Sequence, residues 1–188
     1  PVTRLPEDLS GLRGLTSLNV ANCTNLETLI CYNTGITSLS LSNLSKLKML
    51  RCYNTKLSSL TVTGKSNLTE LNCSNCTSLT SLYCYQNKLT TLNVSPLTKL
   101  GTLSCSGNPS LTSITGLANS ASTLTHLYAD DCNMASLDVS SLSKLETLTC
   151  ANNRITSLNV QGKTAIGITS LQWQPAHITL CAGLLVAL

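Results

Sequence analysis

The stretch from Leu79 to Val94 reads LTSLYCYQNKLTTLNV and is one copy of a recurring unit, Leu-x-x-Leu-x-Cys-x-x-Asn-x-Leu-Thr-x-Leu-x-Val. Further copies run over Leu26–Leu41, Leu47–Val62 and Leu145–Val160. From Leu26 to Leu47 the unit advances by 21 residues. A repeat of this length predicts a solenoid of stacked short coils. No unit can bury its apolar face alone, so neighbouring units must share one continuous core.

Side chains alternate between the two faces of a strand, so the fourth and sixth positions of the unit point the same way. The fourth position holds Leu29, Leu50, Leu71, Leu82, Leu103, Leu127, Leu148 and Leu171, and the sixth holds Cys31, Cys52, Cys73, Cys84, Cys105, Ala129, Cys150 and Trp173. We expect both columns to face inward. The second half of the unit adds another apolar pair, such as Leu60 and Val62, so the coil has two apolar edges.

Asparagine recurs directly after the predicted strand, at the eighth or ninth position of the unit. The residues concerned are Asn33, Asn54, Asn75, Asn87, Asn108, Asn152 and Asn153. Backbone groups lose their sheet partners where the chain turns inward, and a side-chain amide offers both donors and acceptors to them. The pattern therefore predicts a buried amide ladder, with Cys23, Cys76 and Cys132 in the same slot of other units.

These residues resemble the leucine-rich-repeat family, and the cysteine at the sixth position is similar to the 21-residue cysteine-ladder repeats of internalin-J-like bacterial surface proteins. The resemblance implies a right-handed leucine-rich-repeat solenoid of the α/β horseshoe class, with about seven to eight coils. Because the unit is short, we expect mostly strand and turn with little helix, the return side being extended or 3₁₀. The expected organisation is an N-terminal cap or partial repeat over 1–14, repeats over 15–173 and a C-terminal cap or tail over 174–188.

Two irregularities interrupt the 21-residue step. From Leu15 to Leu26, and again from Leu68 to Leu79, the step is only 11 residues, so either a half-coil is missing there or the two faces exchange roles. From Leu100 to Leu124 and from Leu145 to Ile168 the steps are longer than 21 residues, which predicts bulging loops.

The ten cysteines are predicted to be free, buried thiols, because most occupy inward repeat positions where a small apolar side chain fills the column. The Cys73-Ser74-Asn75-Cys76 sequence has the CxxC form, yet both of its cysteines already have repeat positions. Redox or zinc chemistry would need a second pair or an activating environment. We therefore expect no metal site and no cofactor.

All five tyrosines fall on outward positions of the predicted strands, the face that is concave in leucine-rich repeats and usually carries the ligand. Tyrosine combines apolar area with a hydroxyl and is enriched at binding hot spots. Cross-strand stacking that only stabilises the sheet is the alternative. The candidate ligand-binding residues are Tyr32, Arg51, Tyr53, Tyr83, Tyr85 and Tyr128. If the faces exchange at Leu68, Tyr83 and Tyr85 leave this patch.

Several classes of function are disfavoured by composition. The net charge of +4 comes from scattered residues without a basic cluster, and aromatics make up 3 %, so a nucleic-acid groove is not expected. No stretch is long and apolar enough to insert into a membrane. His126 lies near Asp130 and Asp131, but no nucleophile motif or phosphate loop accompanies them. We expect no catalytic residues and no enzyme.

The sequence thus favours a non-catalytic module that binds a protein ligand on its concave face. The resemblance implies a secreted or surface-displayed bacterial protein, extracellular, with a role in adhesion or host interaction. Two alternatives remain: a structural spacer that displays another domain, and an ice or lattice binder using the row Thr37, Ser58, Thr90, Thr112 and Thr156. The apolar tail Leu184–Leu188 is a candidate for self-association.

Overall fold

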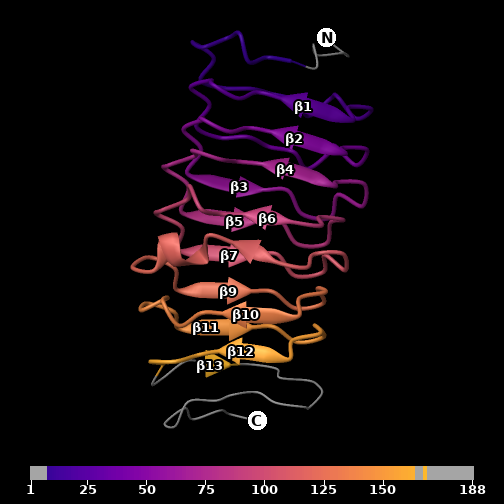
Figure 1. Ribbon diagram of the computed structural model, residues 1–188. Helices are drawn as coiled ribbons and strands as arrows, with labels where there is room; N and C mark the ends of the chain where they lie inside the picture. The colour runs from indigo at the N-terminus through magenta and orange to yellow at the C-terminus, as the bar shows by residue number, and fades with distance from the viewer. Residues whose placement is uncertain (1–7, 164–166, 169–188) are drawn as a thin grey trace.

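The computed structural model describes residues 8–163 and 167–168, which form a stack of flattened coils (Figure 1). Each described strand has two or three residues and lies on one of two opposite faces of the stack. Leu171, Trp173, the tail 174–188 and the first seven residues of the expected cap lie outside the described residues.

One face carries a continuous parallel sheet of six strands in the order β13-β11-β9-β7-β5-β3. We call it the Tyr83 face. Its strands are β3 (Ser59–Thr61), β5 (Ser81–Tyr83), β7 (Thr102–Ser104), β9 (His126–Tyr128), β11 (Thr147–Thr149) and β13 (Gly167–Ile168). A bridge between Leu18 and Leu39 precedes these strands in the chain.

The opposite face, called here the Tyr32 face, has shorter sheets. β1 (Thr28–Ile30), β2 (Met49–Arg51) and β4 (Glu70–Asn72) form a parallel three-stranded sheet. Two parallel pairs follow: β6 (Leu92–Asn93) with β8 (Ile114–Thr115), and β10 (Ser136–Asp138) with β12 (Ser157–Asn159). Asp8 bridges to Ile30, so the stack already begins at residue 8.

The two faces exchange roles at the 11-residue step from Leu68 to Leu79, which decides between the alternatives that the sequence left open there. β3, from the second half of its unit, pairs with β5, from the first half of the next, with Leu60 opposite Leu82. The Lys88 amide donates to the Leu68 carbonyl at 2.9 Å, which stacks the segment leading into β6 on the segment leading into β4. The first-half strands therefore move from the Tyr32 face to the Tyr83 face at this point.

Leucine and cysteine columns form the core, as the alternation predicts. Leu29, Leu50, Leu82, Leu103, Leu127 and Leu148 are fully buried, whereas Leu71 is partly exposed. The nine cysteines among the described residues are all free and buried, which confirms the expected thiols. The exchange divides the cysteine ladder: Cys31, Cys52 and Cys73 follow strands of the Tyr32 face, and Cys84, Cys105 and Cys150 follow strands of the Tyr83 face.

The asparagines separate into two columns, so the single buried ladder predicted from sequence is wrong in part. At the ninth position Asn87 and Asn108 are buried, and Thr34, Thr55, Cys76 and Cys132 fill the same slot. The eighth position is left-handed, at φ 52–57° in Asn33, Asn54, Asn75, Gln86, Asp131 and Asn152, and at 68° in Gly107. Asparagine is favoured there because its side chain tolerates the left-handed region. The asparagines of this column are exposed.

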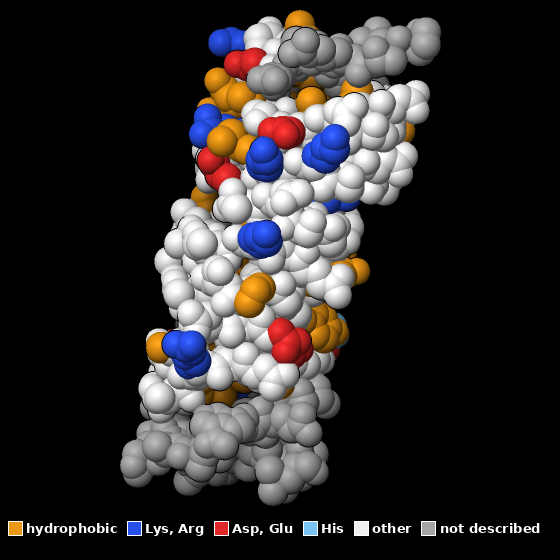
Figure 2. Space-filling view, turned by 90° about the vertical axis from the view of Figure 1, so that its right-hand side faces the viewer, with side chains coloured by type: hydrophobic (Ala, Val, Ile, Leu, Met, Phe, Trp, Pro, Cys, Tyr) orange, Lys and Arg blue, Asp and Glu red, His pale blue; other side chains and the backbone are white. Residues whose placement is uncertain are grey.

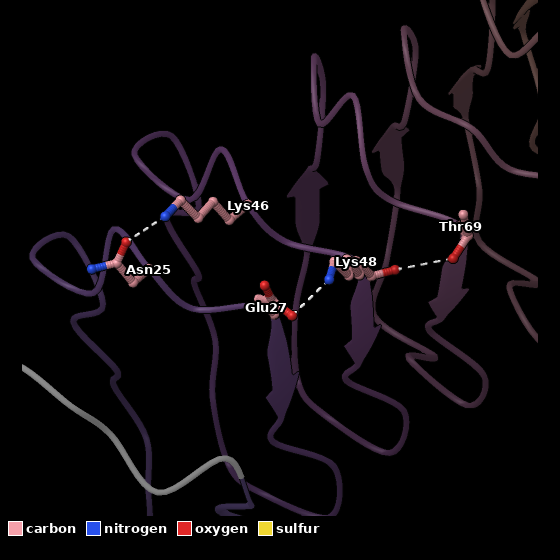
Figure 3. A network of polar contacts seen from close by, with 5 residues as sticks. All are labelled: Asn25, Glu27, Lys46, Lys48 and Thr69. Atoms are coloured by element: carbon pink, nitrogen blue, oxygen red, sulfur yellow. Dashed lines mark hydrogen bonds and ion pairs between the residues drawn. The ribbon is translucent and has the colours of Figure 1, made fainter.

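Polar ladders also run along the edge of the stack (Figure 3). Lys46 donates to Asn25 Oδ1 at 2.8 Å, and Lys48 forms an ion pair with Glu27 at 2.7 Å, each across one 21-residue step. Thr69 Oγ1 donates to the Lys48 carbonyl at 3.4 Å in the next coil. Such exposed pairs hold register more than they add stability.

The coil count and helix content come close to expectation. The longest sheet gives about six turns within the described residues, slightly fewer than the seven to eight expected. One 3₁₀ helix, η1 (Leu117–Ser120), lies in the long step between Leu100 and Leu124, confirming a bulge there. No helix of the described residues is long and apolar enough to cross a membrane.

Gly116 precedes η1 and allows the bulge to pack, so Gly116→Ala should lower the free energy of unfolding by about 2–4 kcal/mol. Its φ is +84°, and an added Cβ would clash with the backbone and the hydroxyl group of Ser95. Gly64→Ala is the matched control, because Gly64 has φ +64° but nothing within 4 Å of the added Cβ. It should lose only about 1 kcal/mol. Urea unfolding of the two variants measures the difference, and equal losses would contradict the clash.

Candidate functional site

Tyr32 and Tyr53 stack face to face on the outer surface of the Tyr32 face. Their ring centroids lie 4.3 Å apart with an interplanar angle of 7°. Each tyrosine comes two residues after its strand ends, one repeat apart, so the parallel register of β1 and β2 places one ring over the other. Both side chains are half-buried. Loss of solvent raises the pKa of Tyr53, as does the neighbouring Tyr32 hydroxyl group.

Arg51 lies on β2 beside this pair and forms an ion pair with Glu70 on β4. Its Nε donates to Glu70 Oε1 at 2.8 Å, and this hydrogen bond raises the pKa of Arg51. Both side chains remain about 41 % exposed. The ion pair uses one of the five guanidinium donors, so the planar group is held in place while most of its donors stay available. We call Tyr32, Arg51 and Tyr53 the Tyr32 patch.

The other three candidate residues lie on the opposite face, so the six do not form one patch. Tyr83 ends β5 and Tyr128 ends β9, and Ser104 of β7 lies between them in register. Tyr85 follows β5 and is 37 % exposed. The physical reason is the exchange at the 11-residue step, which carries every later first-half strand to the Tyr83 face. That any of these residues binds a ligand stays a prediction.

His126 and Asp130 do not form an acid–base pair. The His126 ring is hydrogen-bonded through Nδ1 to Thr125 Oγ1 at 2.8 Å and lies 6.3 Å from the Tyr128 ring. Asp130 instead accepts hydrogen bonds from Thr149 Oγ1 and from the Ala151 amide in the following coil. Asp130 therefore holds one coil on the next, whereas the His126 side chain contacts neighbours in its own coil.

The cysteines of the CxxC sequence are equally engaged in packing. Cys76 Sγ donates to the Cys52 carbonyl at 3.1 Å and lies 3.2 Å from Thr55 Oγ1. Burial raises the pKa of Cys73 to about 12. Within the part of the chain that the structure describes, no cluster of His, Cys, Asp or Glu could hold a metal ion.

An open cavity of about 450 Å³ adjoins the Tyr32 patch. It is lined by Arg13, Asn33, Thr34, Gly35, Asn54 and Lys56. Asn33 and Asn54 directly follow the two stacked tyrosines, so the cavity lies where the chain turns away from that face. Sequence reasoning missed it, because Arg13 and Lys56 belong to different parts of the unit. The asparagine that recurs at the left-handed eighth position was the sequence signal that could have pointed to this turn.

Comparison with known proteins finds one family model and several solved structures that are similar to this chain. Residues 77–119 match the family model described as leucine-rich repeats (2 copies). The search of curated proteins finds no match. Among solved structures, the chain is similar to the functional domain of internalin J from Listeria monocytogenes, which includes a cysteine ladder. The identity is 30 %, over 77 % of this chain and 36 % of that chain, with a TM-score of 0.41.

Two further solved structures are similar. The Toll–Spätzle complex of Drosophila matches at 21 % identity, over 74 % of this chain and 22 % of that chain, with a TM-score of 0.41. A leucine-rich-repeat protein of Leptospira interrogans matches at 20 % identity, over 81 % and 47 %, with a TM-score of 0.42. The chain spans less than half the length of each of these three chains.

The recurring unit and the family-model match over residues 77–119 together show that this chain carries leucine-rich repeats.

Proposed function

We propose that this chain is a non-catalytic module that binds a protein ligand through the Tyr32 patch. The observation that carries the proposal is the stacked pair Tyr32–Tyr53 beside an arginine that is held by Glu70. Tyrosine and arginine are the residue types most enriched at binding hot spots. A stacked pair is already ordered, so a partner that covers it loses little side-chain entropy on binding.

The surroundings of the patch suit recognition of a protein. The face seen in Figure 2 consists mostly of uncharged side chains and backbone, with a few charged groups and separate hydrophobic side chains among them. The half-buried rings and Arg51 therefore differ in chemistry from the serine- and threonine-rich remainder of the surface. Leucine-rich-repeat proteins generally act as interaction modules, which agrees with this assignment.

The setting we propose is a bacterial protein that is secreted or displayed on the cell surface and acts in adhesion or host contact. Support comes from the similarity to leucine-rich-repeat proteins of two bacteria, Listeria monocytogenes and Leptospira interrogans. The proposal concerns this chain as a binding module, since it spans only part of those proteins.

Ice or lattice binding is the weaker alternative, because the threonine row is divided by the exchange of faces. Thr37 aligns with Thr16 on one edge of the stack, and Thr112 aligns with Thr90 on the other, through backbone hydrogen bonds of 3.3 Å each. Thr112 Oγ1 also donates to the Thr90 carbonyl at 3.5 Å. The hydroxyl groups thus serve the turns, a common use of threonine.

Replacing Tyr32 and Tyr53 with alanine should weaken capture of a surface protein at least about 30-fold, the effect of losing a hot spot of about 2 kcal/mol. Extracts of host and bacterial surfaces supply the partner, and biolayer interferometry measures the Kd. Tyr83→Ala/Tyr128→Ala is the matched control, since it removes two half-buried tyrosines from the opposite face. Circular dichroism checks that both variants fold.

Three other outcomes would count against the proposal. Equal binding by both double variants would move the site away from the tyrosines. Loss of binding only in the Tyr83→Ala/Tyr128→Ala variant would place the site on the Tyr83 face. Absence of any captured partner would favour a structural spacer.

A further inference from the structure

The cavity beside the Tyr32 patch has a chemistry of its own. Its six lining residues include two cations, Arg13 and Lys56, and no carboxylate. Among the described residues, the ion pairs are Lys48–Glu27 and Arg51–Glu70, and neither involves Arg13 or Lys56. Both cations are exposed at the surface. The cavity therefore gathers positive charge that the described part of the chain does not neutralise.

The nearby acidic groups are already engaged. Glu27 and Glu70 are held in those two ion pairs. Asp8, whose charge is felt by Tyr53, accepts the Ser10 amide at 2.8 Å, a hydrogen bond that helps to lower the pKa of its carboxyl group. The carboxylates around the patch thus have partners of their own. An anionic group of a ligand could therefore contact Arg13 and Lys56 without displacing these carboxylates from their partners.

The turn that lines the cavity orients a hydrogen-bond donor toward the same space. Asn54 Nδ2 donates to Asn33 Oδ1 at 2.8 Å, which uses the amide oxygen of Asn33 and leaves its Nδ2 group without an acceptor among the described residues. The backbone amide of Asn33 donates to the Tyr53 carbonyl at 3.1 Å, and that of Asn54 donates to the Ser74 carbonyl at 2.9 Å. The left-handed backbone is thus fixed, and the side-chain amide is the free donor.

We infer that this cavity binds a carboxylate of the protein partner, either an Asp or Glu side chain or a C-terminal carboxylate, next to an apolar residue that covers the Tyr32–Tyr53 pair. The inference rests on the proposed function, because it names the chemistry of a ligand for the same site. An arginine fork, a lysine ammonium and an amide N–H offer a carboxylate the charge-assisted hydrogen bonds that it prefers. The partner is therefore an acidic peptide segment with an aromatic or aliphatic neighbour.

A small carboxylate tests the cavity without any partner. N-acetyl-L-glutamate, titrated into ¹⁵N-labelled protein, should shift the side-chain amide resonances of Asn33 and Asn54 saturably. N-acetyl-L-glutamine is the uncharged control and should not shift them. Arg13→Gln/Lys56→Gln should abolish the shifts, whereas Lys88→Gln/Lys99→Gln, which removes two exposed lysines elsewhere, should keep them. Equal shifts with both compounds, no shifts, or tighter binding of inorganic phosphate than of N-acetyl-L-glutamate would overturn the inference.

A second arm uses a random 12-residue peptide library selected on the intact chain. Selected peptides should be enriched in Asp or Glu beside an aromatic or aliphatic residue. Their Kd should rise about 5- to 10-fold in Arg13→Gln/Lys56→Gln, the order expected for two partly exposed charge pairs, and rise with salt. Selected peptides without acidic residues, or with unchanged Kd in this variant, would overturn the inference.

The two arms separate the inference from the proposed function. Shifts with N-acetyl-L-glutamate, together with partner binding that does not depend on Tyr32 and Tyr53, would uphold the carboxylate site and refute the tyrosine site. Partner binding that depends on the tyrosines but not on Arg13 and Lys56, together with absent shifts, would refute the carboxylate site alone.

Discussion

Replacing Asn108 with alanine should lower the free energy of unfolding by about 2–4 kcal/mol, since a buried polar group left without a partner costs about 1–3 kcal/mol and further hydrogen bonds are lost with the amide. Asn108 is 0 % exposed. Its Oδ1 accepts the Leu89 amide at 3.0 Å, and its Nδ2 donates to the Cys84 carbonyl at 2.9 Å and the Cys105 carbonyl at 2.7 Å. Alanine would leave the Leu89 amide inside the coil without a partner, whereas the Cys84 carbonyl would keep Asn87 Nδ2 and the Cys105 carbonyl would keep the Cys132 thiol. A loss of this size is a large fraction of the stability of an ordinary domain.

The chain offers two comparisons that test this explanation. Threonine fills the same column at Thr34 and Thr55, where each hydroxyl donates to a carbonyl three residues earlier, at 2.7 and 2.9 Å. Asn108→Thr should therefore keep one hydrogen bond and lose less stability than Asn108→Ala. Asn25→Ala removes an exposed amide that pairs only with Lys46 and should change stability by less than about 0.5 kcal/mol. Urea unfolding gives the free energy of unfolding of all three variants. A loss below about 1 kcal/mol in Asn108→Ala would contradict the idea that the buried amide stabilises the coils.

The inward columns could be predicted from sequence because two independent constraints coincide there. A strand alternates its faces with a period of two, and the unit repeats every 21 residues, so Leu50 and Cys52 must both face the core and lie next to Leu29 and Cys31. The thiols follow from the same reasoning. Nothing outside the repeat is needed, and this is why the solenoid itself was predictable.

The exchange of faces could not be decided from sequence, because both halves of the unit present similar apolar pairs to the core. Leu60 and Val62 can stack on Leu82 and Cys84 as well as on another second-half pair, since their volumes and spacing are alike. The 11-residue step signalled an irregularity without saying how the chain resolves it. The division of the tyrosines between two faces is a direct consequence of this choice.

The asparagine columns show a different limit, because one residue type serves two physical purposes at adjacent positions. Asn108 is needed for its three buried hydrogen bonds, whereas Asn54 is needed for its left-handed backbone at φ 54°. Gln86, Gly107 and Asp131 share the left-handed position, a mixture that buried amides would not tolerate. The mixture was visible in the sequence. The cavity beside Arg13 was not, because it depends on how that segment lies against the first coils.

Raising the pH from 7.5 to 10 should lower the free energy of unfolding strongly, by about 1–2 kcal/mol for each buried thiol that cannot ionise in the fold. Burial raises the pKa of Cys31 and Cys73 to about 12 and that of Cys150 to about 11, and it raises the pKa of Cys84 further. In the unfolded chain a thiol ionises near pH 8.5. The unfolded state thus releases protons first, so stability is complete below about pH 8 and falls as the pH rises toward 11 or 12.

Cys84→Ala isolates the thiol contribution, because Ala129 already occupies the same column and shows that alanine fits. At pH 7.5 the variant should be about 1–2 kcal/mol less stable than the unaltered chain, because it buries less apolar surface. Between pH 7.5 and 10, its free energy of unfolding should fall by about 1–2 kcal/mol less than that of the unaltered chain. Lysines and tyrosines titrate identically in both proteins, so the difference between the two slopes belongs to Cys84. In the Cys52–Cys76 pair one hydrogen bond raises the pKa of the first thiol and lowers that of the second, so this pair adds little net slope. Urea unfolding with a reductant at both pH values gives the four free energies, and parallel slopes would show that the ladder thiols ionise as freely in the fold as outside it.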